Sequence, residues 1–244
     1  MRTTRIFFDG SLHYGEQLTL SRDQIHYLGR VLRLKSGSRV NLFNGTGSEF
    51  ACEIMQLDNK SGTISVGEPV FSATESPLNI CLALGLSKGD RFDWAIQKAT
   101  ELGVTEIQPL FSERTEIRLS GDRIEKKVLH WQAVVRSACE QSGRTKLPQV
   151  QPPAHLDSYL KRHISGEKLV LDPQADARLS THNFDVSSSS VALLIGPEGG
   201  LSEGELARIK QVGFVAVSLG PRVLRTETAP VAAISVIQSR LGDG

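Results

Sequence analysis

Two glycine-punctuated segments near the C-terminus constrain the fold more than any other feature of this chain. The first is Leu193–Ser202, Leu-Leu-Ile-Gly-Pro-Glu-Gly-Gly-Leu-Ser, and the second is Leu219–Ala229, Leu-Gly-Pro-Arg-Val-Leu-Arg-Thr-Glu-Thr-Ala. In each, an apolar strand pattern leads into a Gly/Pro turn and is followed by a helix pattern. Turns at the ends of strands are where α/β proteins bind ligands, so the two segments together predict one pocket built from both.

The first seventy residues have the pattern of a small β domain. Five short, partly alternating apolar runs are separated by turn residues; they are 5–8, 17–20, 39–43, 50–57 and 62–66. One helix is expected after the N-cap residue Ser21, with an apolar stripe formed by Ile25, Leu28, Val31 and Leu32. Five strands and one helix predict a small β-barrel, which often binds oligonucleotides although the fold alone does not fix that role.

After a linker at 71–77, strand patterns alternate with helix patterns. Strands are expected at 78–86, 107–111, 169–172, 190–195 and 214–219, and helices at 90–102, 124–141, 203–212 and 228–241. This alternation predicts an α/β domain with a mostly parallel, buried sheet. We therefore expect two domains, 1–72 and 73–244.

Composition excludes several classes of protein. The chain has 244 residues, 39% of them hydrophobic and 23% charged, which is ordinary for a globular protein. No apolar run approaches the roughly 18–20 residues that span a bilayer, and no signal peptide is visible, so we expect a cytoplasmic protein that does not enter membranes. Three widely spaced cysteines and six histidines without ligand spacing predict neither a disulfide framework nor a metal site.

Positive charge gathers at the N-terminus although the net charge is only +1. Residues 1–40 contain seven basic and three acidic side chains, and the basic ones are Arg2, Arg5, Arg22, Arg30, Arg33, Lys35 and Arg39. Such a cluster is a candidate phosphate-binding surface, but a solvated face explains the charge alone equally well.

The two glycine segments have separate local chemistry. The turn at 196–200 is neither a P-loop nor a dinucleotide fingerprint, because no Gly-Lys-Ser/Thr and no GxGxxG pattern occurs. Ser202 can cap the following helix with Glu205 in the capping-box position. The helix at 228–241 is so apolar that it must be buried, in a core or against a partner subunit. Arg222 and Arg225 precede it and suit a phosphate or base clamp, or a surface ion pair.

At this point the chain resembles a known family. Its segments 196–202 and 219–229 are similar to the two signatures of bacterial 16S ribosomal RNA (uracil-N3)-methyltransferases, which belong to the SPOUT class of S-adenosylmethionine enzymes. Four upstream motifs also match: Lys88–Arg91, Gln97–Val104, Ser112–Arg114 and Cys139–Arg144. The resemblance extends over essentially the whole chain.

The resemblance implies a fold, a cofactor and partners. It implies an N-terminal PUA-like β-barrel that binds RNA, a C-terminal SPOUT domain with a trefoil knot at about 168–244, and a homodimer that acts on 16S ribosomal RNA or the small subunit. S-adenosyl-L-methionine would bind three loops, 171–173, 194–200 and 219–229. The implied cofactor-binding residues are Leu171, Leu194, Ile195, Gly196, Pro197, Gly199, Gly200, Leu219, Gly220, Leu224, Thr226, Thr228 and Ala229. No metal is implied.

Methylation at uracil N3 requires removal of a proton from a nitrogen that is protonated at neutral pH. Positioning of the sulfonium should supply much of the acceleration. A base, or cationic groups that stabilise the uracil anion, would supply the rest. Arg222 and Arg225 are candidates for anion stabilisation or phosphate anchoring, and Glu198 and Glu227 for the base. Alternatively, Glu198 organises its loop and Glu227 favours a helix N-terminus.

RNA contacts are expected from the arginines at positions 2, 5, 22, 30 and 33 and from Arg114 and Arg144, although the last two also suit structural ion pairs. The same class of enzyme also methylates ribose 2′-hydroxyls and guanine N1, which leaves those targets as alternatives. A further alternative is a non-catalytic RNA-binding protein with an inactive knot.

Overall fold

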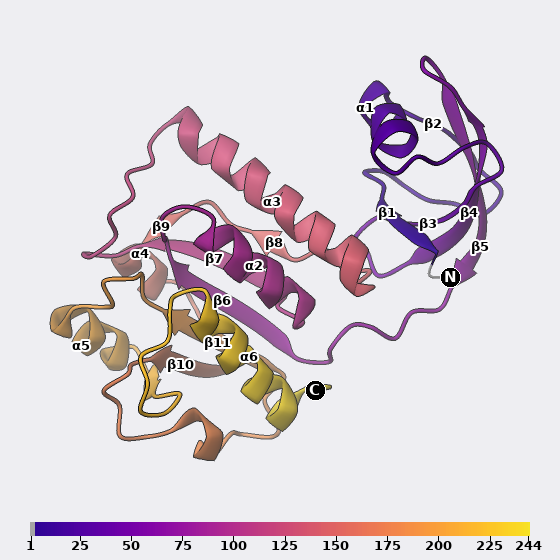
Figure 1. Ribbon diagram of the computed structural model, residues 1–244. Coiled ribbons are helices and arrows are strands. Elements are labelled where there is room, and N and C mark those ends of the chain that lie inside the picture. Colours follow the sequence, from indigo (N-terminus) through magenta and orange to yellow (C-terminus); the bar gives the residue numbers. More distant parts are fainter. Residues whose placement is uncertain (1–2) are drawn as a thin grey trace. The chain divides into compact units, whose positions relative to one another are not determined.

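The computed structural model describes residues 3–244 and divides them into two compact units (Figure 1). The N-terminal unit contains the chain up to Glu75 together with Cys139–Leu147, and the C-terminal unit contains Ser76–Ala138 and Pro148–Gly244. The segment Cys139–Leu147 belongs to the N-terminal unit because of its contacts in space. A single boundary along the sequence therefore cannot separate the two units. Arg2 lies outside the described residues.

The N-terminal unit is built on a five-stranded sheet. Its strands are β1 (Thr4–Phe7), β2 (Gln17–Thr19), β3 (Arg39–Phe43), β4 (Glu49–Leu57) and β5 (Gly62–Val70), in the order β1-β3-β4-β5-β2. β1 pairs with β3 in parallel and the other pairs are antiparallel. Two register shifts between β4 and β5 mark bulges, which bend a sheet around its core. No ladder joins β1 to β2 among the described residues, so hydrogen bonds do not close the predicted barrel.

The predicted helix of this unit begins as expected and then changes its pitch. Ser21 caps α1 (Arg22–His26) in a capping box with Gln24. The chain continues as a π-helical turn, η1 (Tyr27–Val31), in which the backbone N–H of Leu32 donates to the carbonyl of Tyr27. This wider turn rotates later residues out of an α-helical register, which is why Val31 is 59% exposed and the predicted stripe is wrong at that position.

The C-terminal unit contains a parallel sheet. Its strands are β6 (Asn79–Gly85), β7 (Glu106–Phe111), β8 (Gln149–Val150), β9 (Ala154–His155), β10 (Glu167–Leu171), β11 (Ser190–Ile195) and β12 (Val215–Val217). The order is β12-β10-β11-β6-β7-β8, with β9 also paired to β7, and every ladder is parallel. The central strands are buried on both faces, as their continuous apolar runs predict.

Helices cover this sheet. They are α2 (Arg91–Glu101), α3 (Asp122–Ser142), α4 (Leu156–Leu160), the 3-10 turn η2 (Leu179–Thr181), α5 (Glu203–Gln211) and α6 (Thr228–Leu241). Side chains of α4 and α5 form one core with alternate residues of β6, β10 and β11. α2 and α6 pack against each other (Figure 1). The sequence pattern missed the short elements β8, β9, α4 and η2. No helix in residues 3–244 is long and apolar enough to cross a membrane.

Candidate functional site

Three loops meet where β10, β11 and β12 end. These strands lie in the same half of the sheet and run in parallel, so their carboxyl ends share one edge. Backbone hydrogen bonds tie the first loop to the third: the N–H of Asp172 donates to the carbonyl of Val217 (3.0 Å), and Ser218 donates to Ala177 (2.8 Å). Carboxyl ends of parallel strands are the usual ligand site of an α/β sheet.

The loops enclose a cavity of about 490 Å³, within the range of small-molecule sites. Its wall combines apolar residues and glycines with polar and charged residues such as Asp172, Glu203 and Arg222. Of the residues predicted to bind a cofactor, the wall contains Leu171, Ile195, Gly196, Pro197, Gly200, Leu219, Gly220, Leu224, Thr226 and Ala229. Most members of the three predicted loops therefore line one cavity.

Three residues of the predicted cofactor set lie elsewhere. Leu194 points into the core under α4 and α5, because strand alternation turns it away from the cavity. Gly199 lines a neighbouring pocket, and Thr228 is exposed in the first turn of α6. The structure adds further wall residues outside the predicted set, including Gln174, Leu201, Glu203, Leu206, Val217, Ser218 and Val223. Some belong to the loops and others to α5 and β12, so the fold rather than a local pattern brings them to the cavity.

Glycine is required where the second loop approaches β6. A Cβ at Gly85 would overlap the backbone nitrogen of Pro197 and lie 2.7 Å from the carbonyl carbon of Gly196. Gly200 has φ of +70° and donates its N–H to the carbonyl of Pro197 (2.8 Å), which closes the turn. The glycines thus allow the loop to lie against the end of β6.

Ser202 and Glu205 fix the helix that follows this loop. They form the predicted capping box, with the Ser202 N–H donating to the Glu205 carboxylate at 2.9 Å. The other oxygen of Glu205 accepts a hydrogen bond from the N–H of Glu113 (2.8 Å). Glu205 is buried, so one carboxylate connects the second loop to the segment after β7. By contrast, no side chain caps α6 at its N-cap residue Glu227.

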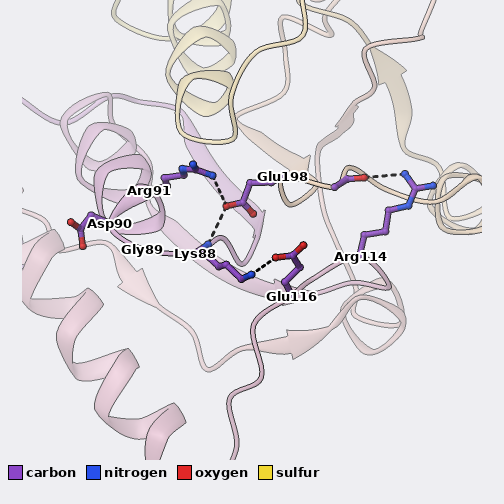
Figure 2. Close-up of a pocket in the computed structure, with 8 residues that line it drawn as sticks. Lys88, Gly89, Asp90, Arg91, Arg114, Glu116 and Glu198 are labelled. Atoms are coloured by element: carbon purple, nitrogen blue, oxygen red, sulfur yellow. Dashed lines mark hydrogen bonds and ion pairs between the residues drawn. The ribbon is translucent and has the colours of Figure 1, made fainter.

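A second pocket of about 390 Å³ lies beside the cavity and is lined mainly by charged residues: Lys88, Gly89, Asp90, Arg91, Arg114, Glu116, Glu198 and Gly199. We call it the polar pocket. Oε1 of Glu198 accepts from the N–H of Lys88 (3.1 Å) and from Nη1 of Arg91 (3.2 Å). The Lys88 ammonium pairs with Glu116, and hydrogen bonding to Lys88 lowers the pKa of that carboxyl. Figure 2 shows these pairs side by side, whereas Asp90 points away from them.

The four candidate catalytic residues differ in their positions. Glu198 lines both the cavity and the polar pocket, and Arg222 lines the cavity. Arg225 is exposed and lines neither of them. Glu227 is half-buried, and its Oε2 is enclosed without a hydrogen-bond partner in the described part of the chain. The structure therefore brings two of the four to the pockets.

The candidate RNA-binding arginines also separate into groups. Arg22, Arg30 and Arg33 are exposed around α1 and η1, and Arg114 is exposed at the polar pocket, where its Nη1 donates to the carbonyl of Gly199 (2.9 Å). Arg33 has φ of +55°, a conformation that is uncommon outside glycine.

Arg5 and Arg144 are not free to contact RNA, so the prediction is wrong for both. The Arg5 side chain is only 8% exposed, and its guanidinium donates hydrogen bonds to Glu49 and to backbone carbonyls. Arg144 is buried and pairs with Glu75 (2.9 Å), as the alternative interpretation proposed. Charge along the sequence does not reveal such partners, because the carboxylates are distant in the chain.

Comparison with known proteins identifies the family. A family model for an RNA methyltransferase domain matches residues 74–238, and one for an RNA methyltransferase PUA domain matches residues 20–66. The ribosomal RNA small subunit methyltransferase E of Buchnera aphidicola (Schizaphis graminum) is 37% identical over 99% of this chain and 98% of its own. The chain belongs to the ribosomal RNA small subunit methyltransferase E family. The Bacillus subtilis member of this family is 32% identical over 90% of this chain and 88% of its own.

Solved structures extend the likeness to three dimensions. A methyltransferase of Legionella pneumophila, crystallised with bound S-adenosylmethionine, has a TM-score of 0.95 and 38% identity over all of both chains. A family member from Neisseria gonorrhoeae, also bound to S-adenosylmethionine, has a TM-score of 0.92 and 36% identity over 99% of both chains. The predicted family and the pairing of a PUA domain with a methyltransferase domain are thus confirmed.

Proposed function

We propose that this protein transfers a methyl group from S-adenosylmethionine to N3 of a uridine in the 16S ribosomal RNA of the small subunit. The observation that carries this proposal is the cavity formed by the three loops after β10, β11 and β12. It occurs in a chain that matches S-adenosylmethionine-bound structures over almost its full length. A ribosomal substrate would also place the enzyme in the cytoplasm.

The cavity wall suits this cofactor chemically. Apolar side chains such as Leu171, Leu219 and Leu224 would contact the adenine ring, and loop backbone groups would hydrogen-bond its edge. Gly196 supports the fit, because a Cβ there would come within 3.0 Å of Leu201 Cγ and narrow the loop. When bound, the cofactor supplies a methyl group that its sulfonium has already activated.

Residues of the chain must accept the N3 proton and stabilise the uracil ring. Glu198 is our candidate for accepting the N3 proton, since it alone of the two candidate carboxylates lines the cavity and the polar pocket. Its contacts with Lys88 and Arg91 orient the carboxylate before substrate binds. Arg222, at the cavity wall, would stabilise negative charge on the uracil oxygens. Arg225 would act from outside these walls by anchoring a phosphate. The charge of Glu227 would interact favourably with the N-terminal dipole of α6, without a capping hydrogen bond.

The RNA would be held by the N-terminal unit through exposed cations. Arg22, Arg30 and Arg33 lie within one short stretch around a π-helical turn, and π turns are frequent at functional sites. Contacts from such side chains go mainly to phosphates, so they would position the RNA without reading its sequence.

Two further features belong to this proposal: a trefoil knot at about 168–244 and a homodimer. Within this span, backbone hydrogen bonds join the 172–179 loop to the end of β12, and Arg240 donates a hydrogen bond to the carbonyl of Ser180. Val231, Ala232 and Val236 leave a half-buried apolar strip on α6, which supports a subunit interface. Sedimentation equilibrium would measure the assembly directly.

The decisive experiment is mass spectrometry of ribosomal RNA from cells that lack this protein. We expect 3-methyluridine to disappear from 16S RNA and to return when the wild-type chain is supplied. Loss of a ribose 2′-O-methyl or of 1-methylguanosine would assign a different target. An unchanged modification pattern, together with no calorimetric binding of S-adenosylmethionine, would refute methyl transfer and favour a non-catalytic RNA-binding protein.

A further inference from the structure

The polar pocket offers a mixed set of hydrogen-bonding groups next to the proposed methyl-donor cavity. We propose that it binds the uracil ring of the target nucleotide by its N3 edge. Glu198 accepts the N3–H, and the cationic groups around it donate to the two uracil carbonyls. This inference rests on the function proposed above and adds the recognition site for the base.

Location is the first argument. Only Arg114 and Glu198 line both the cavity and the polar pocket among the described residues. Methyl transfer requires the accepting nitrogen to lie where the donor and acceptor sites meet, because the reacting atoms must be aligned at near-contact distance. A uracil that occupies the polar pocket with N3 toward Glu198 meets this requirement. A base bound at a distance from the cavity would not.

The arrangement around Glu198 is the second argument. Its Oε1 is already held by Lys88 and Arg91, whereas Oε2 takes no hydrogen bond from the residues described here. One carboxylate oxygen is thus fixed and the other remains available as an acceptor. Arg91 uses one N–H on Glu198, and Arg114 uses one on Gly199, so each guanidinium keeps further donors. Figure 2 shows both arginine side chains on either side of Glu198.

Charge balance is the third argument, and it distinguishes a base from a phosphate. Lys88 pairs with Glu116 and Arg91 with Glu198, so two of the three cations in the wall are neutralised within it. Phosphate sites present uncompensated cations or converging backbone N–H groups. A wall of paired charges instead favours a neutral ligand with both donors and acceptors, which a nucleobase is.

The pattern also selects among bases. The Watson–Crick edge of uracil presents an acceptor, a donor and an acceptor, and enzymes that act on a flipped base read this edge. Cytosine carries a lone pair at N3 and an amino group at C4, which would face a carboxylate acceptor and a cationic donor. A site that hydrogen-bonds a specific edge disfavours a mismatched base, because the mismatch leaves donors and acceptors of the complex without partners.

Uridine itself is the probe for this pocket. In nuclear magnetic resonance titrations of the full-length protein with S-adenosylhomocysteine, we expect uridine to shift the amide signals of Gly89, Arg114 and Gly199. Cytidine should bind at least about tenfold more weakly. Inorganic phosphate should leave these signals unchanged. Larger shifts with phosphate than with uridine would assign an RNA-backbone site instead, and equal responses to uridine and cytidine would overturn edge recognition.

Variants test the residue roles. Arg91→Gln should lower kcat/KM for the RNA by about tenfold or more, the usual effect of losing a charged hydrogen bond, with S-adenosylmethionine affinity unchanged. Arg123→Gln, an exposed arginine on α3, is the matched control and should behave as wild type. Glu198→Gln should reduce the uridine-to-cytidine preference in the titration, because an amide can donate to cytosine N3.

The proposed methyl transfer and the proposed uracil site can be refuted separately. If the wild-type enzyme produces 3-methyluridine but uridine shifts none of the pocket amides and Arg91→Gln is fully active, the base pocket is refuted and the proposed function stands. If no 3-methyluridine forms, the proposed function fails, and the uridine titration still decides whether the pocket binds a uracil ring.

Discussion

Arg5 and Glu49 form a bidentate ion pair inside the N-terminal unit. Arg5 donates from Nε and Nη2 to both carboxylate oxygens at 2.8–3.1 Å, and from Nη1 and Nη2 to the carbonyls of Cys139 and Arg144. The same guanidinium lies 4.6 Å from the centre of the Phe43 ring. One side chain therefore ties β1 to β4 and to the Cys139–Leu147 segment.

We predict that Arg5→Ala lowers the free energy of unfolding by about 3–5 kcal/mol, because it leaves the Glu49 carboxylate buried without its cationic partner and with only the Asn41 amide as a donor. Urea unfolding followed by circular dichroism would measure the change. Arg5→Lys should retain only part of the stability, since an ammonium cannot match both carboxylate oxygens. The exposed Arg22→Ala is the control and should change stability by less than about 0.5 kcal/mol. Equal effects of Arg5→Ala and Arg22→Ala would contradict a structural role for Arg5.

The exposed arginines around η1 should act on RNA affinity instead. We predict that Arg30→Ala combined with Arg33→Ala weakens binding to 16S RNA and reduces the slope of log affinity against log salt concentration by about 1.5, as expected for two lost phosphate contacts. Filter binding across a salt series measures both quantities. Calorimetry should show unchanged affinity for S-adenosylmethionine. A matched double variant, Arg123→Ala with Lys126→Ala, removes two exposed charges from α3; an identical loss there would mean that the effect is net charge alone.

Close approach of the second loop to β6 gives a third prediction. Gly85→Ala should reduce S-adenosylmethionine affinity by about tenfold or more, because the new Cβ collides with Gly196 and Pro197 and pushes the loop into the cavity. Gly204→Ala is the matched control in the next helix, where the nearest atom to the added Cβ is Arg208 Nη1 at 3.5 Å. It should leave binding unchanged and raise stability by up to about 1 kcal/mol. Calorimetry on both variants compares them, and equal affinities would exclude the steric role of Gly85.

Much of this architecture could be predicted because the signals are local. Buried parallel strands have continuous apolar runs, and the Gly196–Gly200 turn directly follows such a strand. Ser202 and Glu205 have the spacing of a capping box. The errors have a different physical origin. Arg5 pairs with Glu49, which is 44 residues away along the chain. Val31 is rotated out of the apolar stripe by a π-helical turn that has no signature in the amino-acid composition. The polar pocket assembles Lys88, Arg114 and Glu198 from three separate loops, so only the fold could bring them together.

Two thiols with raised pKa values, Cys81 and Cys139, make the stability of the chain depend on pH in the alkaline range. Burial raises the pKa of Cys81 from 9.0 to about 12, despite opposing effects of Tyr159 and Arg162, and it raises the pKa of Cys139 similarly. Cys81 lines a cavity of about 320 Å³ together with Tyr159 of α4, and Cys139 is fully buried in the Cys139–Leu147 segment of the N-terminal unit. Below about pH 8 both thiols are mostly protonated in the folded and unfolded chain, so they contribute little pH dependence there.

Between about pH 9 and 12 the folded protein keeps protons that the unfolded chain releases, and the free energy of unfolding must fall as the pH rises. We predict that Cys81→Ala and Cys139→Ala each make this decline shallower than in the wild type. Urea unfolding at stepwise pH from 8 to about 11 measures the slopes, and each variant's own value at pH 8 corrects for lost packing. Cys52→Ala offers a comparison, because burial raises the pKa of this thiol while backbone hydrogen bonds from Gly67 and Leu42 oppose the increase. Slopes that stay parallel in all four proteins would show that the two thiols ionise alike in the folded and unfolded states.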